Sequence, residues 1–424
     1  MSRSWVHTWV TCLVLASLGT PSHLGAQNTE ASETGEPVVL GQRFILQSSV
    51  LDEERPVLVY TPPGYDQSPD GLPVLYLLDG DGHFHHASGV AQFLSSNLRM
   101  PGMIVVGIPN VSQDGRTRDL TPPLTVADTA NRFPTAGGGS NFLRFLTEEV
   151  QPWVERRYRT QPFRILVGHS FGGLFITQVL MEDPDAFEAY VSISPSLWWD
   201  EGKFVAQAAS IFEDHPDLSG WLHMTMGNEG GEMLAGAWSL ASILETKAPE
   251  SFRWKWSHMP DEDHGSVPHR SLYDGLEWIF QGWNLPDAFG LAMAEGGAGW
   301  SEINEHYSEL SERFGFTVRA PEQMVNQAGY ILLREKRLDD AIRAFEMNVD
   351  LYPRSANVFD SLGEAYEAAC RWEEARESYA TAYRMGSEGS DPNAETYKAN
   401  LDRLMAKMDS GETCVVGGSL PGTD

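Results

Sequence analysis

The stretch RILVGHSFGGLF, residues 164–175, decides the fold. It places Ser170 between Gly168 and Gly172, after a short apolar run and before a segment with helical spacing. In a strand–turn–helix context the two glycines permit a turn too tight for side chains, and the serine is lifted above the strand end. The same string also fits a non-catalytic turn. The rest of the chain therefore has to supply a base, an acid and oxyanion donors.

Apolar strands alternate with helices around this stretch. Residues 43–51 and 56–65 predict two strands joined by the acidic turn DEER, as a hairpin at an antiparallel edge. Continuous apolar runs at 72–80 and 102–110 suit strands buried on both faces, and 140–158 predicts one helix. Further strand–helix pairs follow up to Trp283. We therefore predict an α/β fold with a mainly parallel sheet covered by helices on both faces.

The composition of the chain changes after Trp283. The segment that follows is rich in Gly, Ala and Pro and is typical of a linker, and residues 301–315 predict one helix. From Glu322 a pattern then recurs at a spacing of 34 residues. Its matched pairs are Gly329 with Gly363, Ala341 with Ala375, and Phe345 with Tyr379. This pattern resembles a pair of tetratricopeptide repeats, closed by a capping helix. Two repeats are few for independent stability, so we expect them to pack against the larger domain.

The N-terminus predicts an export signal. Arg3 precedes the apolar stretch 9–19, which is too short to span a bilayer, and small residues favour cleavage after Ala26. An uncleaved anchor is the alternative. After cleavage we expect a secreted or periplasmic protein without stable membrane insertion. The predicted organisation is a signal peptide (1–26), a disordered N-terminus (27–37), a hydrolase domain (38–285), a linker and helix (286–321), repeats with a cap (322–405) and a disordered tail (406–424).

Composition narrows the class of partner. The formal net charge of the 424-residue chain is −29, from 30 Lys and Arg against 59 Asp and Glu. Such a surface repels phosphate backbones, so no nucleic-acid partner is expected.

Cys12 lies in the predicted signal, which leaves Cys370 and Cys414. Two cysteines are not a disulfide framework, and whether they pair stays open.

A base should follow the last strand, in the loop before the last helix. His264, in DEDHGS, occupies that loop. His258 falls inside the strand pattern and is expected to be a core histidine. His269 falls where the helix should begin, and we expect it at the surface or at a pocket rim. We therefore assign His264 as the base.

The sequence offers several candidates for the carboxylate that orients His264. After the strand WLHMTMG, the loop GNEGGEM carries Glu229 at its first bend and Glu232 at the expected start of a helix, where the helix dipole also explains a carboxylate. Asp261, Glu262 and Asp263 could orient His264 locally. Glu229 is the first choice, with Glu232 as the alternative. The acid would hold the tautomer of the imidazole and stabilise the imidazolium.

Oxyanion donors should come from two backbone turns. The amide of Phe171 begins the helix after the nucleophile, and the loop LLDGDGH supplies the amide of Asp81 or Gly82. The DGDGH string lacks the remaining ligands of a calcium loop. His83, His85 and His86 lack a second ligand cluster for zinc, so we expect a pocket wall or helix start there. No metal or organic cofactor is expected.

Several side chains near the nucleophile could contact a substrate. Trp198 and Trp199 follow the next strand, where they wall a pocket or pack in the core, and His169 adjoins Ser170. Three arginines lie in the loop region after the fourth strand. They could bind an anionic group of the substrate, but we favour the interpretation that they are solvated loop residues. They are Arg116, Arg118 and Arg132.

Six segments together resemble the "Putative esterase" family of α/β-hydrolases, over about residues 38–283. They are LYLLDGDGHF, DLTPP, GGGSNFLRFLTEEVQPWVERRYRT, ILVGHSFGGLF, SISPSLWWD and DEDHGSVPHRS. The family groups enterobactin and salmochelin esterases with esterase D-like, feruloyl and acetyl-xylan esterases. The resemblance implies Ser170 as nucleophile and His264 as base. It favours the siderophore-esterase-like branch. The sequence departs from the usual pattern at the acid, where Gly230 stands in place of the common acidic residue.

These features predict a serine esterase that acts on a small-molecule carboxylic ester. Two alternatives remain. The same residues could transfer an acyl group to a sugar or lipid hydroxyl. A degenerate hydrolase domain could instead serve as a binding protein whose repeats recruit a protein partner.

Overall fold

The computed structural model describes residues 35, 37–66, 68 and 70–413. The predicted signal peptide lies outside this range, as do Cys12 and Cys414, whereas Cys370 is disulfide-bonded. Within the described range, the helices are all too short or too polar to cross a membrane.

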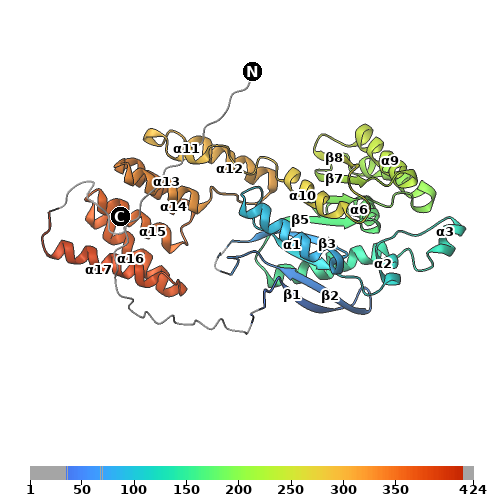
Figure 1. The fold of residues 1–424 in the computed structure, drawn as a ribbon, viewed down its shortest axis with the longest axis horizontal. Helices are drawn as coiled ribbons and strands as arrows, with labels where there is room; N and C mark the ends of the chain where they lie inside the picture. Colours follow the sequence, from blue (N-terminus) through green and yellow to red (C-terminus); the bar gives the residue numbers. More distant parts are fainter. Residues whose placement is uncertain (1–34, 36, 67, 69, 414–424) are drawn as a thin grey trace, which may run out of the picture. The chain divides into compact units, whose positions relative to one another are not determined.

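A single mixed sheet of eight strands forms the centre of the hydrolase region (Figure 1). Its spatial order is β1-β2-β4-β3-β5-β6-β7-β8. In chain order the strands are β1 (Gln42–Ser48), β2 (Glu53–Tyr60), β3 (Leu72–Leu78), β4 (Ile104–Ile108), β5 (Thr160–His169), β6 (Ala189–Ile193), β7 (Gly220–Gly227) and β8 (Phe252–Met259). β1 pairs antiparallel with β2, and β2 pairs antiparallel with β4, while all other pairs are parallel. The predicted antiparallel edge and parallel centre are therefore confirmed.

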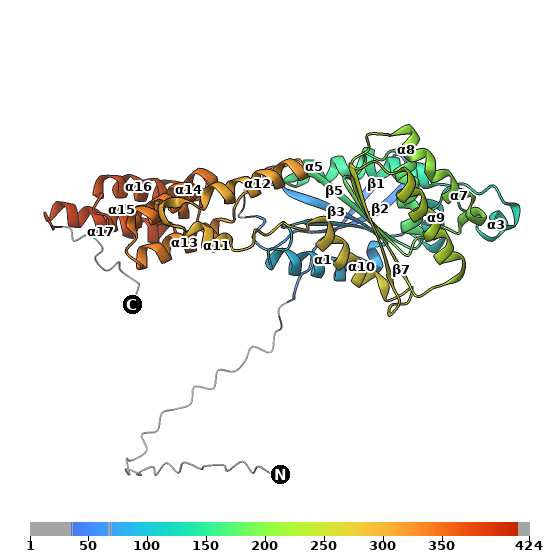
Figure 2. The same ribbon diagram turned by 90° about the horizontal axis from the view of Figure 1, so that it is seen from above.

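Helices cover both faces of this sheet. Helices α1 (Gly80–Ser96) and α10 (Val267–Ile279) share one apolar core with the strands, and Figure 2 shows them on one side of the sheet. The other core is formed by α4 (Gly139–Arg144), α5 (Gln151–Arg157), α6 (Phe171–Glu182), α8 (Ser210–Asp214) and α9 (Gly231–Lys247). Because the central strands are buried on both faces, their sequences are continuous apolar runs.

Three local features differ from the sequence expectations. The β1–β2 turn covers 49–52, so Glu53 and Glu54 lie in β2 rather than in an acidic turn. The segment expected as one helix at 140–158 contains a π-helical part, η1 (Phe145–Val150), between α4 and α5. The helix expected from Gly202 onward is broken. Its pieces are α7 (Lys203–Ala206), η3 (Gln207–Ala209) and α8, and the short η2 (Trp199–Gly202) precedes them.

Short helices α2 (Gln113–Asp119) and α3 (Ala127–Arg132) follow β4. The segment predicted as a linker contains α11 (Ala288–Ala292), η4 (Glu295–Gly297) and α12 (Trp300–Phe314), which matches the helix expected at 301–315. Phe314 of α12 stacks on Trp221 of β7, with ring centroids 5.7 Å apart. Aromatic packing therefore joins the linker helix to the sheet.

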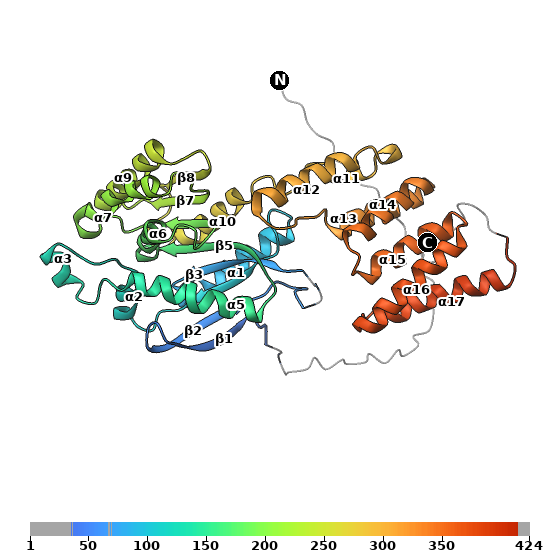
Figure 3. The same ribbon diagram turned by 180° about the vertical axis from the view of Figure 1, so that it is seen from behind.

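The described residues from Glu322 onward form a series of helices joined by short turns, as Figure 3 shows. Its helices are α13 (Glu322–Arg334), α14 (Leu338–Leu351), α15 (Ala356–Ala368), α16 (Trp372–Gly389) and α17 (Ala394–Asp409). Helix α17 continues past the expected boundary at 405. A Cβ on Gly329 would lie 2.6 Å from the Phe345 ring, and one on Gly363 would lie 2.7 Å from the Tyr379 ring. Glycine at both positions therefore lets a paired helix place an aromatic ring there.

Candidate active site

The chain turns sharply at the end of β5. Ser170 has φ 60° and ψ −113°, a strained conformation for a residue other than glycine, and α6 begins at the next residue. A Cβ on Gly168 would lie 2.4 Å from the carbonyl group of Gly172. A Cβ on Gly173 would lie 2.9 Å from Pro195. Glycine at these positions therefore makes room for the turn that presents Ser170.

His264 lies in the loop between β8 and α10, where the sequence analysis expected it. Its Nδ1 donates to Oε2 of Glu229 at 2.6 Å, because an ionised carboxylate can only accept. The Glu229 side chain is only 10% exposed and the His264 side chain 43%. Burial alone would raise the pKa of Glu229, but the hydrogen bond from His264 helps to lower it overall. Glu229 is therefore ionised at neutral pH and fixes the tautomer of His264.

The alternative acid is placed elsewhere. Glu232 lies in the first turn of α9 with an exposed side chain. It lines a hollow of about 720 Å³ with Trp198 and Arg132. Of the two candidates left open by the sequence, Glu229 is the one in contact with His264.

His258 and His269, the two other histidines near the last strand, are both exposed. His258 lies on the edge strand β8, so its expected place in the core is wrong. His269 lies in the first turn of α10, consistent with the expected surface position. The ring of His269 is 5.3 Å from that of His86.

A row of histidines extends from the site across α1. The ring centroid of His169 is 4.4 Å from that of His264 and 5.7 Å from that of His83. Nδ1 of His83 is 3.0 Å from Nε2 of His86. Burial lowers the pKa of His169 to about 3 and that of His86 to about 4. His169 therefore faces His264 as a neutral ring at physiological pH.

The histidines of the HFHH string begin a helix, one of the two places expected for them. Among the residues that the structure describes, no group of three or more His, Cys, Asp or Glu side chains has the arrangement of a metal site.

Two helices begin near the Ser170 turn: α6 at the next residue, and α1 after Asp79, whose carboxylate lies 3.8 Å from a Cβ built on Gly172. Phe171 is the first residue of α6, and Asp81 is the second residue of α1, so both amides lack a carbonyl acceptor within their helices. The Gly82 amide instead donates to the Asp79 carbonyl at 2.9 Å. Of the two loop donors considered, Asp81 is therefore better suited than Gly82 to bind an oxyanion.

Asp79 shapes this loop, and the sequence analysis did not single it out. It precedes α1 in a left-handed conformation, with φ 52° and ψ 42°. Its two carboxylate oxygens accept from Nε and a terminal nitrogen of Arg116 at 2.6 and 2.8 Å, and Asn110 adds a third bond at 2.7 Å. Burial would raise the pKa of Asp79, but these partners lower it overall. The ion pair therefore anchors the loop that carries Asp81.

The three loop arginines have different surroundings. Arg116 is paired with Asp79, and Arg118 is paired with Glu53 and Asp119. The expectation of solvated loop arginines is therefore wrong for these two. Arg132 is exposed, with its guanidinium 5.3 Å from the Phe133 ring centre.

Trp198 and Trp199 have different surroundings. Trp199 is fully buried, and its indole N–H donates to the Pro122 carbonyl at 3.1 Å, so it belongs to the core rather than to a pocket wall. Trp198 is half-buried and lines the 720 Å³ hollow, while its ring lies 6.4 Å from that of Phe171.

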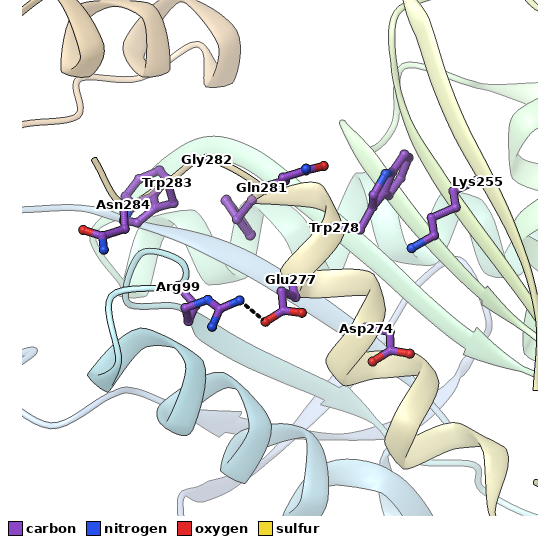
Figure 4. A pocket seen from close by; sticks show the side chains of 10 residues that line it. Arg99, Lys255, Asp274, Glu277, Trp278, Gln281, Gly282, Trp283 and Asn284 are labelled. Carbon is purple, nitrogen blue, oxygen red and sulfur yellow. Dashed lines mark hydrogen bonds and ion pairs between the residues drawn. The ribbon is translucent and has the colours of Figure 1, made fainter. Parts of the chain in front are cut away.

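A second hollow, of about 420 Å³, has polar walls. Its lining includes His169, Asp81 and Gly82, so it adjoins the expected oxyanion loop. A third hollow of about 540 Å³ lies between α10, β8 and the segment after α1 (Figure 4). Arg99 and Glu277 form an ion pair there, and Trp278 and Lys255 lie close together. Its lining contains neither Ser170 nor His264 nor Glu229, so it is separate from this site.

The mainly parallel sheet with helices on both faces, and the sharp turn at Ser170 between β5 and α6, are those of an α/β-hydrolase. The family model described as "Putative esterase" matches residues 48–282, more than half of the chain. The protein belongs to this family.

Two relatives carry siderophore esterase names. The ferri-bacillibactin esterase BesA of Bacillus subtilis is 35% identical over 154 residues, which are 33% of this chain and 52% of the relative. The siderophore triacetylfusarinine C esterase of Aspergillus fumigatus is 30% identical over 194 residues, 42% of this chain and 64% of the relative. The chain thus spans between half and two thirds of these relatives.

A solved structure extends the likeness. An IroE-like serine hydrolase from Shewanella oneidensis is 29% identical, with a TM-score of 0.64, and the match covers 73% of this chain and 99% of that one.

Proposed function

We propose that the protein is an exported serine esterase of the siderophore-esterase type, with Ser170, His264 and Glu229 as its triad. The observation that carries the proposal is the 2.6 Å bond between His264 and the half-buried Glu229. Ser170 lies in a strained elbow, and the ring of its neighbour His169 is 4.4 Å from that of His264. The relatives named as siderophore esterases support an ester-linked siderophore as the substrate class. The apolar stretch at 9–19 supports export, with residues 1–26 as the signal.

The geometry suits a two-step acyl transfer to water. His264 Nε2 takes the proton of Ser170 as Oγ attacks the ester carbon, and the amides of Phe171 and Asp81 bind the oxyanion. The alcohol leaves with the proton that His264 returns. Water then attacks the acyl carbon while His264 accepts its proton, and His264 returns that proton to Ser170 Oγ as the bond between Oγ and the acyl carbon breaks, which releases the acid. Glu229 stabilises the imidazolium in both steps.

The test compares substrates and variants together. The purified protein would be incubated with a serine-trilactone catecholate siderophore, with and without iron, and with p-nitrophenyl butyrate. Products would be identified by mass spectrometry. We expect linear hydroxy-acid products that Ser170→Ala does not form above background. Hydrolysis of p-nitrophenyl butyrate without any cleavage of the trilactone would contradict the siderophore assignment while leaving the esterase assignment intact.

A further inference from the structure

A second buried hydroxyl lies against the proposed nucleophile. Ser196 Oγ is 3.3 Å from Ser170 Oγ, and the Ser196 amide donates to the Ser170 carbonyl at 3.1 Å. Ser196 is only 2% exposed, so its hydroxyl is removed from bulk water and needs a protein partner. Among the side chains that the structure describes, Ser170 is the hydrogen-bond partner it has.

The backbone that carries Ser196 is held firmly. The Ser170 amide donates to the Ile193 carbonyl at 2.9 Å. Ser194 has φ 40° and is fully buried, and its amide donates to the Thr225 carbonyl at 2.9 Å. Its hydroxyl accepts from the Gly227 amide at 3.1 Å. The segment is therefore tied to both neighbouring strand ends, and a strained residue in so fixed a setting is typical of a functional site.

The proton arrangement follows from the partners. Nδ1 of His264 donates to Glu229, so Nε2 of the neutral ring is an acceptor and is suited to receive the Ser170 proton. With its proton directed to His264, Ser170 Oγ can still accept. The Ser196 hydroxyl, whose oxygen is 3.3 Å from Ser170 Oγ, can fill that role.

We propose that Ser196 is a further catalytic residue, whose hydroxyl donates to Ser170 Oγ and stabilises it as the leaving group when the acyl-enzyme is hydrolysed. The inference rests on the proposed triad. In the acyl-enzyme, Ser170 Oγ is an ester oxygen and a weak acceptor. As water adds and the bond to the acyl carbon breaks, negative charge develops on Oγ until His264 returns the proton. A hydrogen bond that strengthens with this charge accelerates the step.

Acylation should depend less on Ser196. There the same hydrogen bond is already present in the resting enzyme, so its loss weakens the ground state and the transition state together. Hydrogen bonds to charged groups are worth about 10- to 100-fold in rate. Removal of the Ser196 hydroxyl should therefore slow deacylation by about 10- to 100-fold and acylation by less than about threefold.

The experiment is a stopped-flow burst measurement with p-nitrophenyl acetate on the full-length protein. Ser196→Ala should keep a burst of one nitrophenolate per active site and show the slower steady-state rate. Ser196→Cys, which retains a weak donor, should fall between this variant and the wild type. The matched control is Ser192→Ala, because Ser192 is also buried but donates to the Gly173 carbonyl at 3.3 Å. Its two rates should match those of the wild type.

Two results would overturn the inference. One is a Ser196→Ala variant with both rates unchanged. The other is an equal loss of both rates in Ser196→Ala, or in Ser196→Cys if the alanine variant does not fold. Failure of the triad itself would be visible separately, since Ser170→Ala would then hydrolyse the ester as fast as the wild type.

Discussion

Replacing Glu229 by glutamine should lower kcat/KM for ester hydrolysis, whereas the same change at Glu232 should not. Glu229 Oε2 accepts from His264 Nδ1 at 2.6 Å, and an amide nitrogen in its place would donate instead. The imidazole would then turn to the tautomer with hydrogen on Nε2, which cannot accept the proton of Ser170. Glu232 is exposed in the first turn of α9 and makes no contact with His264, so its replacement leaves the tautomer of His264 unchanged.

The size of the effect follows from the lost ion pair. Two unit charges about 4 Å apart at an effective dielectric of about 20 attract by about 4 kcal/mol. That energy corresponds to about 10³-fold in rate. Because the His264 side chain is 43% exposed, water screens part of the attraction. We therefore expect kcat/KM to fall by about 10²- to 10³-fold in Glu229→Gln.

The assay is the initial rate of p-nitrophenyl butyrate hydrolysis from pH 5 to pH 9, with thermal unfolding to verify that each variant is folded. Glu232→Gln should stay within about twofold of the wild type, as expected for a surface change. A folded Glu229→Gln enzyme with wild-type kcat/KM would refute the assignment of the acid. An equal loss in Glu232→Gln would refute the claim that contact with His264 distinguishes the two glutamates.

Three further predictions concern the stability of the fold. His223 is fully buried, and burial lowers its pKa from 6.5 to about 4. Below about pH 6.5 the unfolded chain therefore takes up a proton that the folded protein does not, and the free energy of unfolding should fall by about 2 kcal/mol between pH 7 and pH 5. In His223→Gln, urea unfolding should show a decrease that is smaller by this amount. Arg55→Met removes the fully buried partner of Asp119 and should lower the free energy of unfolding by about 3 kcal/mol, whereas the exposed Arg144→Met should leave it unchanged. Gly168→Ala would place a Cβ 2.4 Å from the Gly172 carbonyl and should destabilise the protein by about 2 kcal/mol or more, while Gly89→Ala, with open space around it, should be tolerated.

The sequence predicted the parts of the fold that depend on local pattern. Strand runs and their order defined the parallel centre and the antiparallel edge. The 34-residue spacing placed the starts of α13 and α15, at Glu322 and Ala356. The sequence also limited the acidic member of the triad to two candidates, Glu229 and Glu232. It could not choose between them, because the choice depends on which part of their loop approaches His264.

Features held by distant partners were not predictable. The β1–β2 turn lies at 49–52 because Glu149, about a hundred residues away, accepts from the amides of Ser49 and Val50. The left-handed turn just before the helix expected at Gly202 includes Asp200, whose carboxylate accepts from the Thr125 and Val126 amides.

The contact between the Ser196 and Ser170 hydroxyls also depends on residues far apart in the sequence, so the sequence could not predict it. The sequence context of Ser196, SISPS, indicates only a strand end. The contact with Ser170 arises from the meeting of two loops at the carboxyl edge of the sheet.

The most direct test of the central claim is covalent labelling of Ser170. The full-length protein would be treated with a fluorophosphonate, and the adduct would be located by intact-mass and peptide mass spectrometry while residual esterase activity is followed. We predict one adduct per chain, on Ser170, forming in step with the loss of activity and absent in Ser170→Ala. Full inactivation with the adduct on another residue, or undiminished hydrolysis by Ser170→Ala, would contradict the account.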